Sequence, residues 1–121
     1  MLIPILHFNG NCADAIALYE NAFNTKAYNI EYRDDNKIRH AEMDIHGQMV
    51  FLNDRFGNKD NSLDCAVHLV LTFETVDELK ACYENIKEGG RIIDHFAKTP
   101  YSELVGNFMD KFGVLWGLMV W

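Results

Sequence analysis

The fold of this chain is indicated by residues 65–90, which read CAVHLVLTFETVDELKACYENIKEGG. Residues 65–73 form an apolar run that is typical of a buried strand. Thr75 and Glu78 then match a capping box, in which the hydroxyl and the carboxylate satisfy free backbone N–H groups at the start of a helix. Apolar residues recur at helical spacing after this point, and Gly89-Gly90 is expected to end the helix as its C-cap. The stretch therefore predicts a strand followed by a helix.

The same pattern opens the chain. An offset of 64 residues places Tyr19-Glu20-Asn21 on Tyr83-Glu84-Asn85, and it places Asn11 and Asp14 on the residues of the capping box. An offset of 66 lays residues 43–47, MDIHG, over residues 109–113, MDKFG. Agreement of caps, helix residues and a later segment in consistent order indicates an internal repeat.

Three further strands are expected after each helix, at residues 27–32, 39–45 and 48–53 and at residues 91–95, 106–110 and 114–121. We therefore predict an α+β fold of two tandem βαβββ repeats, about 1–56 and about 64–121, in a single domain. The polar residues 54–64 are expected to connect the repeats. The competing fold is a ferredoxin-like βαββαβ barrel, which requires only one strand after the second helix.

Size, charge and cysteines limit the classes of function. A chain of 121 residues falls within the usual size of one domain. Its formal net charge of −7 and its scattered basic residues argue against nucleic-acid binding. No apolar stretch approaches the ~18 residues that a membrane span needs, and there is no signal sequence at the start. Three cysteines without CxxC spacing suggest neither a disulfide framework nor a zinc knuckle, so we expect a cytoplasmic protein.

Three segments carry a family resemblance: residues 8–15, FNGNCADA, residues 40–42, HAE, and residues 106–116, GNFMDKFGVLW. They resemble the PhnB-like branch of the glyoxalase/bleomycin-resistance/dioxygenase (vicinal oxygen chelate) superfamily, over nearly the whole chain. The resemblance implies the paired βαβββ fold, with a curved mixed sheet around a cavity, and often a homodimer. Some members are labelled methyltransferases, but no glycine loop for such a cofactor is present here.

The resemblance also locates the metal ligands of the metal-dependent members, one on the first strand and one on the last strand of each repeat. In this sequence these positions are Pro4 and His68 on the first strands, and Phe51 and Gly117 on the last strands. Only His68 can bind a metal ion, whereas a catalytic site normally needs about three protein ligands. We therefore expect no catalytic metal and no other cofactor.

Period-two alternation predicts which side chains face the cavity and which face the helices. The predicted cavity residues, including those at the four family positions, are mostly apolar, which favours an apolar or aromatic ligand. The resemblance adds Tyr101 and Ser102 near the cavity mouth. The alternative is that these side chains simply fill the interior of the sheet. The predicted ligand-contacting residues are Leu6, Met49, Phe51, His68, Tyr101, Leu115 and Met119, whereas Ile3, Ile5, Leu52, Trp116 and Leu118 are expected to face the helices.

Two residues are candidates for acid–base chemistry. His68 suits proton transfer near neutral pH, although a lone strand histidine often bonds a backbone carbonyl instead. Glu42 alternates onto one strand face with His40 and Asp44, an arrangement that offers a base and its orienting acid or, more simply, a solvated face. Cys12 lies in the first turn of a helix, where N–H groups favour a thiolate, but a buried cysteine is the simpler interpretation. His7 is expected on the helix side, in a structural role.

Three hypotheses about function follow. The first is a protein that binds or sequesters a small molecule without a catalytic metal. The second is a lyase, isomerase or dioxygenase-type enzyme of the same superfamily, either metal-dependent or using His68 and Glu42 without metal. The third is an interaction or stress-related homodimer that binds no ligand and has Trp121 at the subunit contact.

Overall fold

The structure, a computed structural model, describes residues 1–55 and 68–121. The chain divides into two compact units, Met1–Leu63 and Asp64–Trp121. Most of the expected connector lies outside the described residues, as does Cys65. That the two units make one glyoxalase-like domain stays a prediction.

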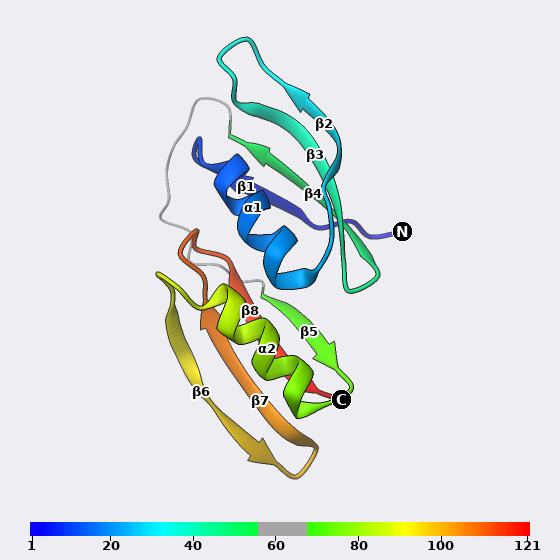
Figure 1. Cartoon of the computed structure of the whole chain (residues 1–121), viewed down its shortest axis with the longest axis vertical. Helices are drawn as coiled ribbons and strands as arrows, with labels where there is room; N and C mark the ends of the chain where they lie inside the picture. The colour runs from blue at the N-terminus through cyan, green and yellow to red at the C-terminus, as the bar shows by residue number, and fades with distance from the viewer. Residues whose placement is uncertain (56–67) are drawn as a thin grey trace. The chain divides into compact units, whose positions relative to one another are not determined.

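Unit 1 contains one helix and a four-stranded mixed sheet, here named sheet A (Figure 1). Its strand order is β1-β4-β3-β2, with β1 parallel to β4 and the other pairs antiparallel. The parallel pair requires a crossover, which the helix provides. The elements are β1 (Ile5–Phe8), α1 (Cys12–Phe23), β2 (Tyr28–Tyr32), β3 (Ile38–Ile45) and β4 (Gln48–Asp54).

Unit 2 repeats this topology in sheet B, whose strand order is β5-β8-β7-β6. Three strands follow its helix, so the predicted βαβββ repeat is confirmed and the ferredoxin-like alternative is wrong. The helix ends at Ile86 with Lys87 as its C-cap, so the expected cap at Gly89-Gly90 is wrong; Gly89, at a φ of 75°, lies in the turn beyond it. The elements are β5 (Leu69–Phe73), α2 (Val76–Ile86), β6 (Arg91–Thr99), β7 (Ser102–Met109) and β8 (Leu115–Val120).

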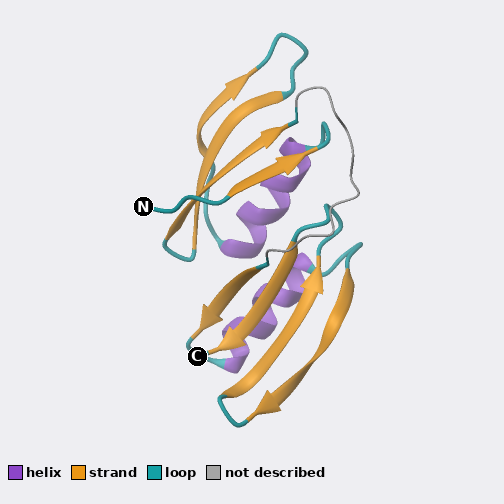
Figure 2. Cartoon of the chain, turned by 180° about the vertical axis from the view of Figure 1, so that it is seen from behind, coloured by secondary structure: helices purple, strands orange, loops and turns teal. Residues whose placement is uncertain are grey.

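Each helix packs on one face of its own sheet and buries the apolar core there. The repeated tyrosines each contact a phenylalanine of their own sheet. Tyr19 lies 6.3 Å from Phe8 between ring centroids, and Tyr83 lies 5.4 Å from Phe108. We call the opposite face of each sheet, seen toward the viewer in Figure 2, its open face. In the described part of the chain, no helix is long and apolar enough to cross a membrane.

The two helices begin in different ways. Thr75 caps α2 as predicted, since its Oγ1 accepts a hydrogen bond from Glu78 N at 3.2 Å. Asn11 is the N-cap residue of α1, as predicted, but its side chain makes no capping hydrogen bond to the helix. Instead the buried carboxylate of Asp54, at the end of β4, accepts hydrogen bonds from Gly10 N and Cys12 N. A residue remote in sequence therefore satisfies the start of α1.

The offset of 64 that aligns the two helices does not align the strands before them, where it is wrong by one residue. Three residues separate Phe8 from Cys12, whereas two separate Phe73 from Val76. The longer turn contains Gly10 at a φ of 91°, a conformation that glycine adopts readily. The first strands are consequently related by an offset of 65, because Ile5 pairs with Phe51 and Val70 pairs with Gly117.

This shift corrects three expectations in β1. Leu6 pairs with Leu52, which is fully buried on the helix face, so Leu6 lies on the helix side and not on the predicted cavity side. A one-residue shift moves every side chain of a strand to the opposite face. Ile5 and His7 are therefore on the open face, contrary to the predicted helix-side positions.

The two aspartates of the repeated MD segments, Asp44 and Asp110, do not occupy equivalent positions, because the strand register differs by one residue there. Four residues lie between the paired Asp44 and Met49, but five lie between the paired Met109 and Leu115. Asp44 is exposed on its strand, whereas Asp110 is buried in the longer turn. The overlay of Met43-Asp44 on Met109-Asp110 is thus wrong by one residue, although Gly47 and Gly113 both occupy positive-φ turn positions.

Candidate functional site

The open face of sheet A combines apolar and titratable side chains. Phe51 lies at its centre, paired with Ile5 on one side and with Glu42 on the other. Met49 and Phe51 are half-buried, in contrast to Val50 and Leu52, which are buried on the helix face. The alternation predicted for β4 therefore matches the structure.

His40, Glu42 and Phe51 form a contact cluster on this face. His40 Nε2 lies 3.3 Å from Glu42 Oε2, and the His40 ring meets the Phe51 ring edge-on at 4.7 Å between centroids. The Glu42 side chain is only 15% exposed, so its carboxylate is partly removed from water. A carboxylate that orients an imidazole is an arrangement capable of accepting and donating a proton.

Two more polar pairs flank this cluster. His7 Nδ1 lies 2.8 Å from Asn53 Oδ1, and it donates a hydrogen bond there when the ring carries its proton on Nδ1. Tyr28 donates its hydroxyl to Asp44 Oδ1 at 3.1 Å. Partial desolvation and this hydrogen bond raise the pKa of Tyr28, which keeps the phenol protonated.

The open face of sheet B carries a different polar group. Asn107 of β7 pairs with Gly117 of β8, and its Nδ2 donates a hydrogen bond to Asp94 Oδ2 at 2.9 Å. A Cβ atom on Gly117 would lie 2.7 Å from Asn107 Oδ1 and 3.5 Å from His68 Cδ2. Asn107 and His68 therefore both reach the space above Gly117, which stays open because glycine has no side chain.

The donor set does not fit the metal ion that the family resemblance implies. Of the four predicted positions, Pro4, Phe51 and Gly117 offer no ligating side chain, and Ile3, which the offset of 65 makes the counterpart of His68, offers none either. Nowhere in residues 1–55 and 68–121 do three histidine, cysteine, aspartate or glutamate side chains gather at metal-binding distance.

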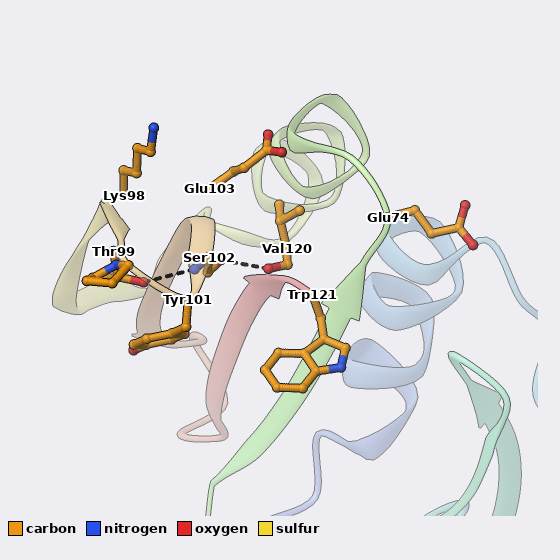
Figure 3. Close-up of a pocket in the computed structure, with 9 residues that line it drawn as sticks. Glu74, Lys98, Thr99, Tyr101, Ser102, Glu103, Val120 and Trp121 are labelled. Carbon is orange, nitrogen blue, oxygen red and sulfur yellow. Dashed lines mark hydrogen bonds between the residues drawn. The ribbon is translucent and has the colours of Figure 1, made fainter.

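A pocket of about 350 Å³ lies at one end of unit 2, between the β6–β7 turn and the end of β8 (Figure 3). Tyr101 and Trp121 line it, and their rings lie on the same side, away from the side chain of Val120. Ser102 also lines it, but its hydroxyl donates a hydrogen bond within the protein, to the backbone oxygen of Val120 at 2.7 Å. Ser102 therefore anchors the strands, while Tyr101 remains available to a ligand.

The two described cysteines are not suited to nucleophilic chemistry. Burial, and secondarily the nearby Asp54 carboxylate, raise the pKa of Cys12 to about 12. Burial raises the pKa of Cys82 to about 12 as well. Because the thiolate is the reactive form, both side chains act as small buried apolar groups near neutral pH.

The predicted site residues are divided between the two units. Of the two candidates for catalysis, Glu42 belongs to unit 1 and His68 to unit 2. Met49, Phe51, Leu115 and Met119 are half-buried on open faces, and Leu6 is the one predicted contact that lies on a helix side. Sequence reasoning gave no role to Asp94 and Asn107, although a glycine inside the last strand was a signal of close approach by another group.

A family model of the Glyoxalase/Bleomycin resistance protein/Dioxygenase superfamily matches residues 2–118 of this chain. Protein YjdN of Escherichia coli strain K12 is 29% identical over 139 aligned residues, which cover 98% of this chain and 94% of that protein.

Two solved structures are also similar. A Bacillus cereus protein, described as a putative 3-demethylubiquinone-9 3-methyltransferase, PhnB protein, superposes with a TM-score of 0.88 at 25% identity and covers 99% of this chain and 98% of that one. Protein PA1353 of Pseudomonas aeruginosa has a TM-score of 0.86 at 23% identity, covers 99% and 96% of the two chains, and shows the shared fold.

Proposed function

Because the chain belongs to the Glyoxalase/Bleomycin resistance protein/Dioxygenase superfamily, in its PhnB-like branch, we propose that it binds or sequesters a small apolar or aromatic molecule without a catalytic metal. The observation that carries this proposal is the half-buried Phe51 on the open face of sheet A, in edge contact with His40. Apolar surface with a few polar groups beside it is the usual composition of a small-molecule site.

The environment of Phe51 supports an aromatic ligand in particular. Ile5, which is 48% exposed, lies beside it on β1, and Glu42 lies beside it on β3. A flat ring that stacks on Phe51 and Ile5 buries apolar area on both partners, and aromatic pairs add to the energy of that burial. The adjacent imidazole then orients a polar substituent.

The alternative is an enzyme of the same superfamily that uses acid–base chemistry. The specific observation in its favour is the 3.3 Å contact between His40 and the mostly buried carboxylate of Glu42. His68, in unit 2, is the other candidate base. The fold alone does not choose between binding and catalysis, because one fold hosts many chemistries.

A titration with 2-methoxynaphthalene, followed by two-dimensional amide NMR, tests the proposal. We expect shifts on β3 and β4 and a dissociation constant at least about fivefold weaker in Phe51→Ala, since that variant loses most of the stacking surface. Tyr32→Ala is the matched control, because Tyr32 is an aromatic residue, 59% exposed, on the edge strand β2.

Absence of shifts on sheet A, or equal affinity of Phe51→Ala and the unaltered protein, would contradict binding at this face. Metal content of protein purified without chelator or affinity tag, measured by mass spectrometry, tests the other half of the proposal. Stoichiometric metal that is lost in His68→Ala would overturn the metal-free assignment and favour the enzyme.

We also propose that the chain acts in the cytoplasm, as its cysteines suggest, and as a homodimer, as the family resemblance implies. Trp121 supports a contact in unit 2, since it is a large apolar side chain that is 79% exposed. Sedimentation velocity should then show dimers that become monomers in Trp121→Asp. A monomer at every concentration would contradict the proposal.

A further inference from the structure

The open face of sheet B contains a fixed hydrogen-bond acceptor that the proposed function does not use. An ionised carboxylate has no hydrogen to donate and can only accept hydrogen bonds. The Asn107 amide must therefore present its nitrogen to Asp94. The distance of 2.9 Å between Asn107 Nδ2 and Asp94 Oδ2 agrees with this orientation. The other end of the amide, the Oδ1 atom, is consequently turned toward Gly117.

Gly117 makes room for this acceptor. It lies in the interior of β8, where a glycine weakens a strand and often marks a close approach by another group. Asn107 Oδ1 lies over Gly117 on the open face, only 2.7 Å from the position that a Cβ atom of residue 117 would take. An alanine at this position would push the amide away, so the glycine and the asparagine form one arrangement.

The face around the acceptor is largely apolar, and its polar groups are the His68 ring, the Asp94 carboxylate and, one residue pair further along, Thr72. Val70 pairs with Gly117 on one side and is 51% exposed. Met119 and Val105, which pair with each other one step further along the same face, are half-buried. The surface thus offers apolar contact area beside the Asn107 oxygen atom, whose orientation Asp94 fixes.

We infer that the open face of sheet B is a binding site for an aromatic or apolar molecule that carries a hydroxyl or N–H donor, with Asn107 Oδ1 as the specificity-determining acceptor. Asp94 is a positioning residue, since it acts through Asn107. His68 lies beside the same space and provides a second polar group for the ligand. A ligand without a donor leaves the acceptor unpaired and loses the hydrogen bond that selects it.

A matched pair of probes, 2-naphthol and 2-methoxynaphthalene, tests this inference, because they differ only by methylation of the donor oxygen. Amide NMR titrations of the whole chain give a dissociation constant for each probe from the shifts of β7 and β8. We expect 2-naphthol to bind about fivefold more tightly than its ether, the effect of one hydrogen bond. In Asn107→Ala the two probes should bind equally.

Two further variants keep the test decisive. Asn85→Ala, on the exposed surface of α2, should keep the fivefold ratio. Asp94→Ala retains the Asn107 side chain but frees its amide, so the ratio should fall while the ether binds as before. This variant also replaces Asn107→Ala if that one does not fold.

Equal binding of both probes to the unaltered protein, or an unchanged ratio in Asn107→Ala and Asp94→Ala, would overturn the assignment of Asn107. Absence of shifts on sheet B would overturn the site itself. The proposed function is judged separately by the shifts on sheet A and by Phe51→Ala, so failure of one does not imply failure of the other.

Discussion

The indole Nε1–H of Trp116 donates a hydrogen bond of 2.9 Å to Asp110 Oδ2 inside the core of unit 2. Both residues are nearly inaccessible, with Trp116 at 1% and Asp110 at 3% exposure. The other carboxylate oxygen accepts from Phe112 N and Val114 N, so Asp110 joins the β7–β8 turn to the core. A buried charge is tolerated when its hydrogen bonds are made in this way.

Trp116→Phe tests the contribution of this hydrogen bond. The phenyl ring preserves most of the apolar contact but removes the donor, so we expect the free energy of unfolding to fall by about 2 kcal/mol. Urea unfolding followed by circular dichroism provides the measurement. Tyr32→Phe is the control, and it should change the stability by less than about 0.5 kcal/mol because Tyr32 is 59% exposed. Equal effects of the two substitutions would contradict the assigned role.

Asp54 is expected to be a larger determinant of stability. Its carboxylate accepts from the backbone N–H groups of Gly10, Cys12 and Ile38 at 2.9, 3.0 and 2.9 Å. Asp54→Ala leaves all three donors without this acceptor, so we expect a loss of about 3 kcal/mol or more in urea unfolding. Asp14→Ala, at an exposed position in the first turn of the same helix, should cost less than about 1 kcal/mol.

The different starts of α1 and α2 predict that alanine substitution at the N-cap residue lowers stability in one helix but hardly in the other. Thr75→Ala removes a side-chain cap and should lower the free energy of unfolding by about 1 kcal/mol. Asn11→Ala removes a side chain that does not cap its helix, and it should change stability by less than about 0.5 kcal/mol. A thermal or urea unfolding series on the two variants decides the point; a larger effect at Asn11 than at Thr75 would show that the assignment of caps is reversed.

The buried thiols of Cys12 and Cys82 should resist alkylation. With pKa values raised to about 12, they carry about a thousandfold less thiolate at pH 8 than a thiol at the ordinary value of 9.0. In a Cys65→Ser background, iodoacetamide should label the folded chain far more slowly than the urea-unfolded chain, as followed by mass spectrometry. Rapid labelling of the folded chain would contradict the burial of these side chains.

The same pKa shift makes stability depend on pH in the alkaline range. Above pH 9 the unfolded chain loses thiol protons that the folded chain retains until about pH 12. The unfolded state therefore binds fewer protons in this window, and the free energy of unfolding falls as pH rises from 9 toward 12. Below pH 9 this contribution to stability is fully present. Cys82→Ala should reduce the slope of stability against pH in urea unfolding, and an unchanged slope would exclude this thiol as a source.

The sequence by itself determined the order of the elements and their repetition. Apolar alternation in β4 and β8, helical spacing around Tyr19 and Tyr83, and the cap at Thr75 are local patterns, because each is set by residues a few positions apart. The positions of Phe51, Met119 and His68 on open faces followed from the same alternation. The prediction from His40 and Glu42 that a base and an acid share one strand face also agrees with their contact.

Only the tertiary structure decided the features that depend on contacts between distant residues. One additional residue in the turn at Gly10 changed the face on which Leu6 and His7 lie, and such a shift is fixed by pairing with β4 rather than by the strand's own sequence. The cap of α1 comes from Asp54, 42 residues after Cys12. The acceptor on sheet B likewise depends on distant residues, because the Asn107 side chain lies over Gly117 and donates a hydrogen bond to Asp94. Local patterns specify elements, but which side chains meet is decided by the register between strands.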